Sequence, residues 1–259
     1  MSSIFKEGIF QGKRILVTGG GSGIGKSIAQ RYLELGAHVM IASRNEEKLQ
    51  SAQKDLSSFG DCHYGVCDIR KEEDIESLSK HITDKMGGLD ILVNNAGGQF
   101  PSLAEDLSKN GWNAVINNNL NGTWYMTQAM GKSFFIPAKS GCILNIIVNI
   151  YRGFPGMVHT GAARAGVDNM TKTLSIEWSK YNININAIAP GLIFSTGFQQ
   201  YPEEIRAGIA KKIPMKRLGT TDEVADLATY LTSSAAAYIT GETVYIDGGS
   251  RLHGDLYEL

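Results

Sequence analysis

Short apolar runs and helical patterns alternate along the N-terminal part of the chain. A continuous apolar run is typical of a parallel strand buried on both faces, and apolar residues three or four positions apart indicate a helix. We therefore predict helices at residues 23–35 and 45–57, a third that begins near Glu72, and strands at residues 13–17, Val39–Ala42, Tyr64–Cys67 and Leu89–Val93. This alternation predicts a doubly wound α/β fold whose parallel strands end at one ligand-facing edge.

The C-terminal part continues the alternation. We predict a long helix that reaches Trp178, a strand at Ile183–Ile188, a helix at Val224–Leu231 and a last strand at Ala235–Ile246. Residues 192–212 show no strand pattern and contain several aromatic residues. A chain of 259 residues is long enough for one large α/β domain or two small ones, and length alone leaves both open.

A glycine-rich stretch between the first predicted strand and helix is the main candidate binding feature. It reads Thr18-Gly-Gly-Gly-Ser-Gly-Ile-Gly25. Glycines allow a tight turn and let backbone N–H groups approach a pyrophosphate, and the following helix presents its positive end to the same anion. The alternative, an ordinary loop, stays open on this motif alone.

Ser43 and Arg44 follow the second strand, where a dinucleotide-binding fold meets the adenosine ribose. An acidic residue there would accept a hydrogen bond from the 2′-hydroxyl of NAD, whereas a hydroxyl and a guanidinium suit the 2′-phosphate of NADP(H). The alternative is that Arg44 is a solvent-exposed residue at the start of the next helix and takes no part in cofactor binding. After the third strand, Asp68 is predicted to accept from the adenine amino group and Ile69 to pack on the ring, unless Asp68 caps the next helix.

Composition narrows the class of protein without selecting a reaction. The 259 residues are 42% apolar and have a formal net charge of −1, with basic residues scattered, so no nucleic-acid-binding face is expected. The sequence has no apolar run of about 18 residues and no signal-peptide core, so we expect a cytoplasmic protein without a membrane span. Cys62, Cys67 and Cys142 lack a CxxC spacing and predict reduced, structural thiols without a metal site.

Several motifs in fixed order resemble the short-chain dehydrogenase/reductase family. Besides the glycine stretch they are Asn94-Asn-Ala-Gly97, Asn119-Leu-Asn-Gly122, Pro190-Gly191 and Ile246-Asp-Gly-Gly249. The resemblance implies one Rossmann-like, dinucleotide-binding domain over residues 1–259, with a seven-stranded parallel sheet and a substrate lid at about residues 192–212. It also implies a nicotinamide cofactor, a small-molecule substrate and commonly a homotetramer. It implies that the cofactor is lined by Thr18, Gly19, Ser22, Ile24, Gly25, Asn95, Ala96, Gly97, Pro190 and Gly191.

The sequence departs from this family where catalysis is expected. The usual catalytic set is an Asn, a Ser, a Tyr and a Lys, and here only the Asn has a counterpart, Asn119. Arg164 stands where the Lys belongs and Thr160 where the Tyr belongs. Arg164 is predicted to hold the ribose hydroxyls as an electrostatic support, because a guanidinium does not give up its proton.

The missing Tyr favours reduction of a carbon–carbon double bond over reduction of a ketone. An alkoxide needs a well-placed acid, whereas the enolate of a thioester can be protonated by water. Tyr151 and, less favoured, His159 are candidates to replace the acid. The His159–Val167 segment also resembles trans-2-enoyl-CoA and 2,4-dienoyl-CoA reductases and dehydrogenases of the citronellol type. We predict an NADPH-dependent 2-enoyl-CoA reductase; the alternatives are a terpenoid-alcohol dehydrogenase and a catalytically silent dinucleotide-binding protein.

Overall fold

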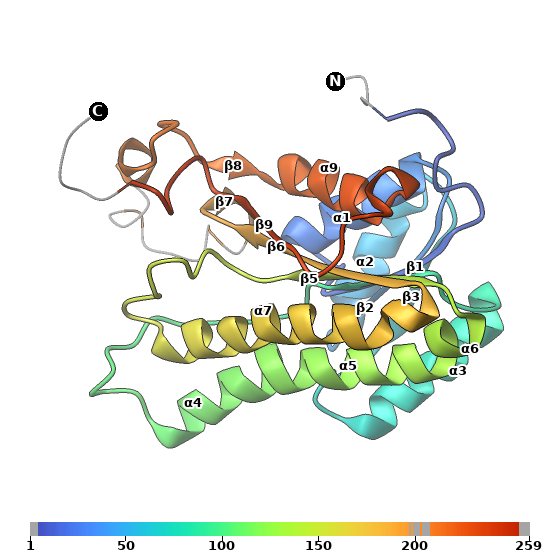
Figure 1. Ribbon diagram of the computed structural model, residues 1–259, viewed down its shortest axis with the longest axis horizontal. Coiled ribbons are helices and arrows are strands. Elements are labelled where there is room, and N and C mark those ends of the chain that lie inside the picture. The colour runs from blue at the N-terminus through green and yellow to red at the C-terminus, as the bar shows by residue number, and fades with distance from the viewer. Residues whose placement is uncertain (1–4, 197, 199–202, 204–207, 254–259) are drawn as a thin grey trace.

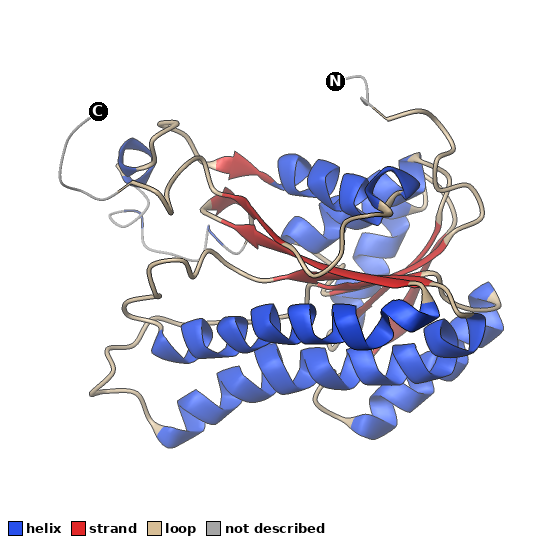
Figure 2. Ribbon diagram, viewed as in Figure 1, coloured by secondary structure: helices blue, strands red, loops and turns tan. Residues whose placement is uncertain are grey.

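A seven-stranded parallel sheet forms the middle layer of the computed structural model, which describes residues 5–196, 198, 203 and 208–253 (Figures 1 and 2). The strand order is β3-β2-β1-β4-β5-β6-β9. The bounds are β1 Arg14–Thr18, β2 His38–Ser43, β3 Cys62–Val66, β4 Ile91–Asn94, β5 Gly141–Ile146, β6 Ile183–Pro190 and β9 Thr243–Ile246. Because the order reverses between β1 and β4, the loops at their carboxyl ends diverge and leave a crevice there. The predicted Rossmann-like fold is confirmed.

Helices cover both faces of the sheet (Figure 1). On one face lie α1 Gly23–Glu34, α2 Glu46–Leu56 and α9 Thr221–Thr232. On the other lie α3 Glu72–Met86, α4 Lys109–Ile116, α5 Gly122–Met130, the short α6 Ile136–Ala138 and α7 Val158–Trp178. π-Helical turns at Asn117–Asn121 and Gly131–Phe135 join α4, α5 and α6, and 3₁₀ turns occupy Ser179–Tyr181, Ile209–Lys212 and Ser234–Ala236. None of the described helices combines the length and apolar character needed to cross a bilayer.

The continuous apolar runs fill both layers of the core because successive strand side chains point to opposite faces. In β1, Ile15 and Val17 pack with α1 and α2, while Leu16 packs with α3 on the other side. The three cysteines are free thiols, as predicted, and burial raises the pKa of each to about 12. They contribute packing rather than reactive thiolates.

Two predicted elements are wrong in extent. The last strand, β9, covers only Thr243–Ile246, because Ser234–Ala236 is a 3₁₀ turn and the Asn184 amide donates to the Ala237 and Ile239 carbonyls, which therefore stay out of the sheet. Within the expected lid, Ile193–Phe194 forms a short strand, β7, that pairs with β8, Gly219–Thr220. Residues 197, 199–202 and 204–207 of that lid lie outside the described residues.

Candidate active site

The glycine turn between β1 and α1 is built against the loop that follows β4. Gly19 has a φ of 68°, and an added Cβ would lie 2.8 Å from the Asn95 amide nitrogen. The Asn95 amide donates to the Thr18 carbonyl at 3.0 Å, and the Thr18 hydroxyl accepts from the N–H groups of Asn95 and Ala96, both at 3.0 Å. Thr18, Asn95 and Ala96 thus join the two loops and fix the shape of the cradle.

The first turn of α1 continues this cradle. A Cβ at Gly25 would lie 2.5 Å from the Gly19 carbonyl oxygen, so the helix and the turn approach each other closely only because both residues are glycines. Ser22 is the N-cap residue, yet its side chain makes no capping hydrogen bond. The Ser22 hydroxyl and the first N–H groups of the helix, including that of Ile24, therefore remain donors for an anion.

At the adenosine end, Ser43 ends β2 and Arg44 follows it directly. Asn45, not Arg44, caps α2 by accepting from the Lys48 N–H at 2.8 Å. The Arg44 guanidinium forms no ion pair with any carboxylate in the described part of the chain. Its charge helps Arg70 to lower the pKa of the Asp68 carboxylate, but no carboxylate is in contact with it in the described structure, so it remains able to bind an anionic group on the ribose.

Asp68 and Ile69 both make contacts within the protein that the sequence did not predict. The Asp68 carboxylate accepts from the Arg70 side chain through two bonds, of 2.8 and 2.5 Å, and this pair lowers the pKa of Asp68 to about 2. The N-cap of α3 is Lys71, so the alternative of Asp68 as that cap is wrong. Ile69 is buried and packs against Gly122 at the start of α5.

Three predicted residues meet at the reaction end of the crevice. The Asn119 amide donates to the Gly98 carbonyl at 2.8 Å and accepts from the Gly98 N–H at 2.9 Å, so it pins the loop after β4. A Cβ at Gly97 would lie 2.8 Å from Asn119 Oδ1 and would clash with the Arg164 guanidinium. The structure therefore brings Gly97, Asn119 and Arg164 together.

Arg164 is buried without compensation. It is 7% exposed, it forms no ion pair in the described structure, and its Nε has no hydrogen-bond partner there. Removal from water lowers the pKa of Arg164 to about 10, which leaves the guanidinium charged at neutral pH. A lone buried charge of this kind requires a ligand acceptor or a charge that develops on a substrate.

Of the two candidate acids, neither lies in contact with Arg164. Tyr151 is 60% exposed, and its ring packs edge-on against Tyr245 with centroids 6.2 Å apart. His159 is fully buried: its Nδ1 accepts from the Thr160 N–H at 2.8 Å, and its ring packs edge-on against Phe100 at 4.7 Å. His159 Nε2, however, is buried and has no hydrogen-bond partner in the described structure, so the ring is not fully satisfied by the protein. Catalytic parts for Tyr151 and His159 both stay predictions.

Pro190 and Gly191 end the sixth strand beside the same loops. The Pro190 carbonyl accepts from the Asn149 N–H at 2.9 Å, and a Cβ at Gly191 would lie 2.8 Å from the Asp247 Cα. The Asp247 carboxylate accepts from the Asn149 amide at 2.9 Å. Sequence reasoning missed Asp247 as the residue that joins the loop after β5 to the segment after β9, although it lies within a recognised motif.

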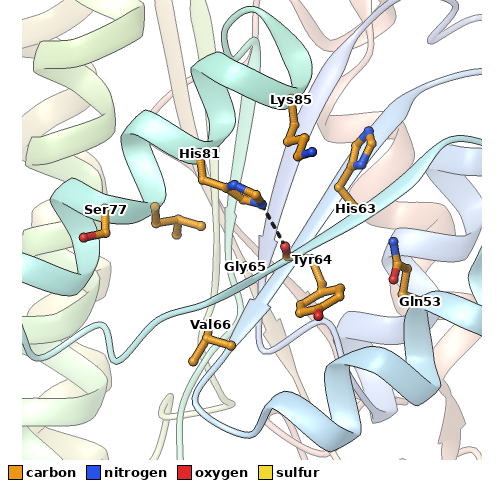
Figure 3. A pocket seen from close by; sticks show the side chains of 9 residues that line it. Gln53, His63, Tyr64, Gly65, Val66, Ser77, His81 and Lys85 are labelled. Atoms are coloured by element: carbon orange, nitrogen blue, oxygen red, sulfur yellow. Dashed lines mark hydrogen bonds between the residues drawn. The ribbon is translucent and has the colours of Figure 1, made fainter.

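A hollow of about 570 Å³ lies elsewhere, along the outer edge of β3, and contains none of the predicted site residues (Figure 3). There Gln53 donates to the Cys62 carbonyl at 2.9 Å, and His81 Nε2 lies 3.2 Å from the Tyr64 carbonyl oxygen. These side chains cover backbone groups that face away from β2. Their arrangement protects the edge strand from pairing with another chain.

Comparison with known proteins agrees with this geometry. The family model described as enoyl-(acyl carrier protein) reductase matches residues 19–251. This chain belongs to the short-chain dehydrogenase/reductase family. It is an oxidoreductase of that family, with a site for a nicotinamide dinucleotide, as the sequence predicted.

Relatives within the short-chain dehydrogenase/reductase family differ in their named reactions. The chain is 41% identical over 247 residues to the "Probable 2,4-dienoyl-CoA reductase [(2E)-enoyl-CoA-producing]" of Bacillus subtilis (strain 168), covering 93% of this chain and 97% of the relative. It is 36% identical to the glucose 1-dehydrogenase of Gluconobacter oxydans (strain 621H), with 95% and 94% covered. The structure of a citronellol catabolism dehydrogenase from Pseudomonas aeruginosa PAO1 matches with a TM-score of 0.87 and 37% identity, covering 96% of this chain and 99% of that one.

Proposed function

We propose that this protein uses NADPH to reduce a carbon–carbon double bond conjugated to the thioester of an acyl-CoA. The observation that supports this reaction best is Arg164, a buried guanidinium that pairs with no carboxylate among the described residues, on the same helix face as the buried Thr160. The site thus offers positive charge but no strong acid where the family has its Tyr. The 2,4-dienoyl-CoA reductase relative supports the same substrate class.

The residues present fit a nicotinamide dinucleotide. Gly19 and Gly25 let the turn and the start of α1 pack closely on Asn95, which shapes the cradle, and the side chain of Ser22 makes no capping bond there. At the other end of the site, the buried Nε of Arg164 has no hydrogen-bond partner in the described structure. Thr18, Asn95 and Ala96 hold the cradle, while Ser43 and Arg44 would receive the ribose 2′-phosphate. We therefore propose NADP(H) as the cofactor.

When bound, the nicotinamide supplies the hydride. As hydride reaches the acyl chain, negative charge moves to the thioester oxygen, and Arg164 stabilises that charge because little water screens a guanidinium that is 7% exposed. Arg164 does not donate its proton, and the hydroxyl of Thr160 is a weak acid. Protonation of the carbon is therefore assigned to solvent, with Tyr151 as the candidate to guide it. Asn119 holds Gly98 through two hydrogen bonds and so keeps the loop after β4 in place beside Arg164.

The experiment that tests this function compares substrates at equal concentration. NADPH oxidation is measured with a 2-enoyl-CoA, a 2,4-dienoyl-CoA and a ketone, and NADP⁺ reduction is measured with citronellol. We expect turnover with one of the two thioesters and none with the ketone. Turnover of the ketone or of citronellol alone would contradict the proposal, and the second outcome would favour the dehydrogenase alternative. NADPH binding without any turnover would favour a silent binding protein.

A further inference from the structure

The arginines in the described part of the chain fall into two groups by their ion pairs. Arg14, Arg31, Arg70 and Arg217 each pair with a carboxylate: Asp90, Asp226, Asp68 and Glu223 respectively. Among the residues that the structure describes, no carboxylate pairs with the guanidinium of Arg44, Arg152, Arg164 or Arg251. These unpaired arginines all lie at the carboxyl ends of the strands. Arg44 follows β2, Arg152 is in the loop after β5, Arg164 contacts the loop after β4, and Arg251 follows β9.

Arg152 and Arg251 lie on two segments that are bonded to each other. The Asn149 amide donates to the Asp247 carboxylate, and the Arg152 guanidinium donates to the Ser250 carbonyl at 3.1 Å. The Arg251 guanidinium lies 4.5 Å from the ring centroid of Tyr245 and 5.8 Å from that of Tyr151. A carbonyl and two ring faces orient these cations but do not neutralise them.

The dinucleotide does not account for this second pair of charges. Its adenosine ribose belongs at β2 and its pyrophosphate at the turn after β1, whereas β5 and β9 lie beyond β4, in the other half of the sheet. A neutral alcohol or ketone would also leave both guanidiniums without a counter-charge. An anionic carrier attached to the substrate would supply that charge.

We propose that Arg152 and Arg251 bind the phosphate groups of the coenzyme A portion of the substrate. Guanidinium groups bind phosphate through paired, charge-assisted hydrogen bonds. The ring of Tyr151 is 60% exposed and lies beside the Arg251 guanidinium, and it provides a face on which the adenine can stack. The inference rests on the proposed reduction of an acyl-CoA. It assigns Arg152 and Arg251 as the residues that favour a substrate carried on coenzyme A.

The test compares one 2-enoyl chain on two carriers, coenzyme A and N-acetylcysteamine, which has no phosphate. KM is measured for both thioesters with the natural protein, Arg152→Gln, Arg251→Gln and Lys85→Ala. The readout is the KM of the N-acetylcysteamine ester divided by that of the CoA ester. We expect this ratio to fall about tenfold in each arginine variant, since each loses a charged hydrogen bond.

Lys85→Ala is the matched control, because it also removes one exposed positive charge, at the β3 edge, and should keep the natural ratio. An unchanged ratio in both arginine variants would overturn the inference. This holds also where both KM values rise by the same factor, because the arginine would then only support the loop that holds Tyr151.

A binding measurement separates failure of this inference from failure of the proposed reaction. Calorimetric titration of the NADP⁺-loaded protein with free coenzyme A, and then with 4′-phosphopantetheine, needs no turnover. Weaker coenzyme A binding in both arginine variants supports the phosphate site even if no thioester is reduced. Equal affinity in all variants contradicts it. Tighter binding of coenzyme A than of phosphopantetheine identifies the nucleotide, rather than the pantetheine phosphate alone, as the group recognised.

Discussion

Replacing Arg164 with methionine should make the cofactor-free protein more stable while it abolishes reduction. Burial lowers the pKa of Arg164 to about 10 from its ordinary value, and this shift corresponds to a penalty of roughly 3 kcal/mol for holding the charge in the folded state. Because the folded-state pKa lies below that of the unfolded chain, the penalty is fully present at every pH below about 10 and fades only above it. The substitution removes this penalty but also the packing contacts of the guanidinium. We therefore expect the free energy of unfolding of Arg164→Met to rise by about 1–3 kcal/mol.

Urea denaturation at neutral pH and one fixed protein concentration measures this gain, since subunit association would also shift the midpoint. Arg14→Met is the matched control: its guanidinium makes bonds of 2.8 and 3.0 Å to the Asp90 carboxylate, so its loss should lower stability. Opposite signs for the two substitutions support the account. A loss of stability in Arg164→Met comparable to that in Arg14→Met would show that the Arg164 charge is compensated within the protein, and would refute the reasoning.

The remaining predictions concern the cofactor cradle. Arg44→Ala should weaken NADPH binding about tenfold and leave NADH binding unchanged, as measured by nucleotide fluorescence; equal losses for both would contradict the 2′-phosphate assignment. Gly97→Ala should fold, as circular dichroism would show, yet lose most activity because its Cβ displaces Arg164. Asp68→Asn should cost about 1–2 kcal/mol at neutral pH by breaking the pair with Arg70. Because the pKa of Asp68 is lowered to about 2, the difference in free energy of unfolding between the natural protein and Asp68→Asn should shrink when urea denaturation is repeated at pH values falling toward 2. A difference that does not change with pH would contradict the ion pair with Arg70 as its cause.

The nucleotide-binding half of the fold was largely predictable because local and long-range signals agree there. Helix α1 was expected at residues 23–35 and covers Gly23–Glu34, and α2 was expected at 45–57 and covers Glu46–Leu56. Residues 235–240 were misjudged because their apolar character does not by itself distinguish a strand from a turn, and the Asn184 side chain binds their carbonyl groups from a distant strand. The π-helical turns around Asn119 depend on backbone hydrogen bonding that the residue pattern does not encode.

For the site, sequence motifs predicted which residues lie together but not which hydrogen bonds and ion pairs they form. Asn119 and Gly97 do lie together with Arg164, as the motif order implied. The bonds of the Asp68 carboxylate to Arg70 and of the Asn149 amide to Asp247 were not foreseen, since they depend on loop conformations. The distinction between paired and unpaired arginines also requires the structure. The homotetramer and the cytoplasmic location stay predictions.

The most direct test of the proposed reduction is to trace both hydrogens that are added to the acyl chain. The natural protein is supplied with NADPH deuterated at the transferred position and a conjugated acyl-CoA in ordinary water, and then with unlabelled NADPH in deuterated water. The account predicts a reduced acyl-CoA with one deuterium in each experiment, seen by mass spectrometry, because one hydrogen arrives as hydride and the other from solvent. Recovery of unreduced acyl-CoA in both experiments, by a protein that binds NADPH, would contradict it.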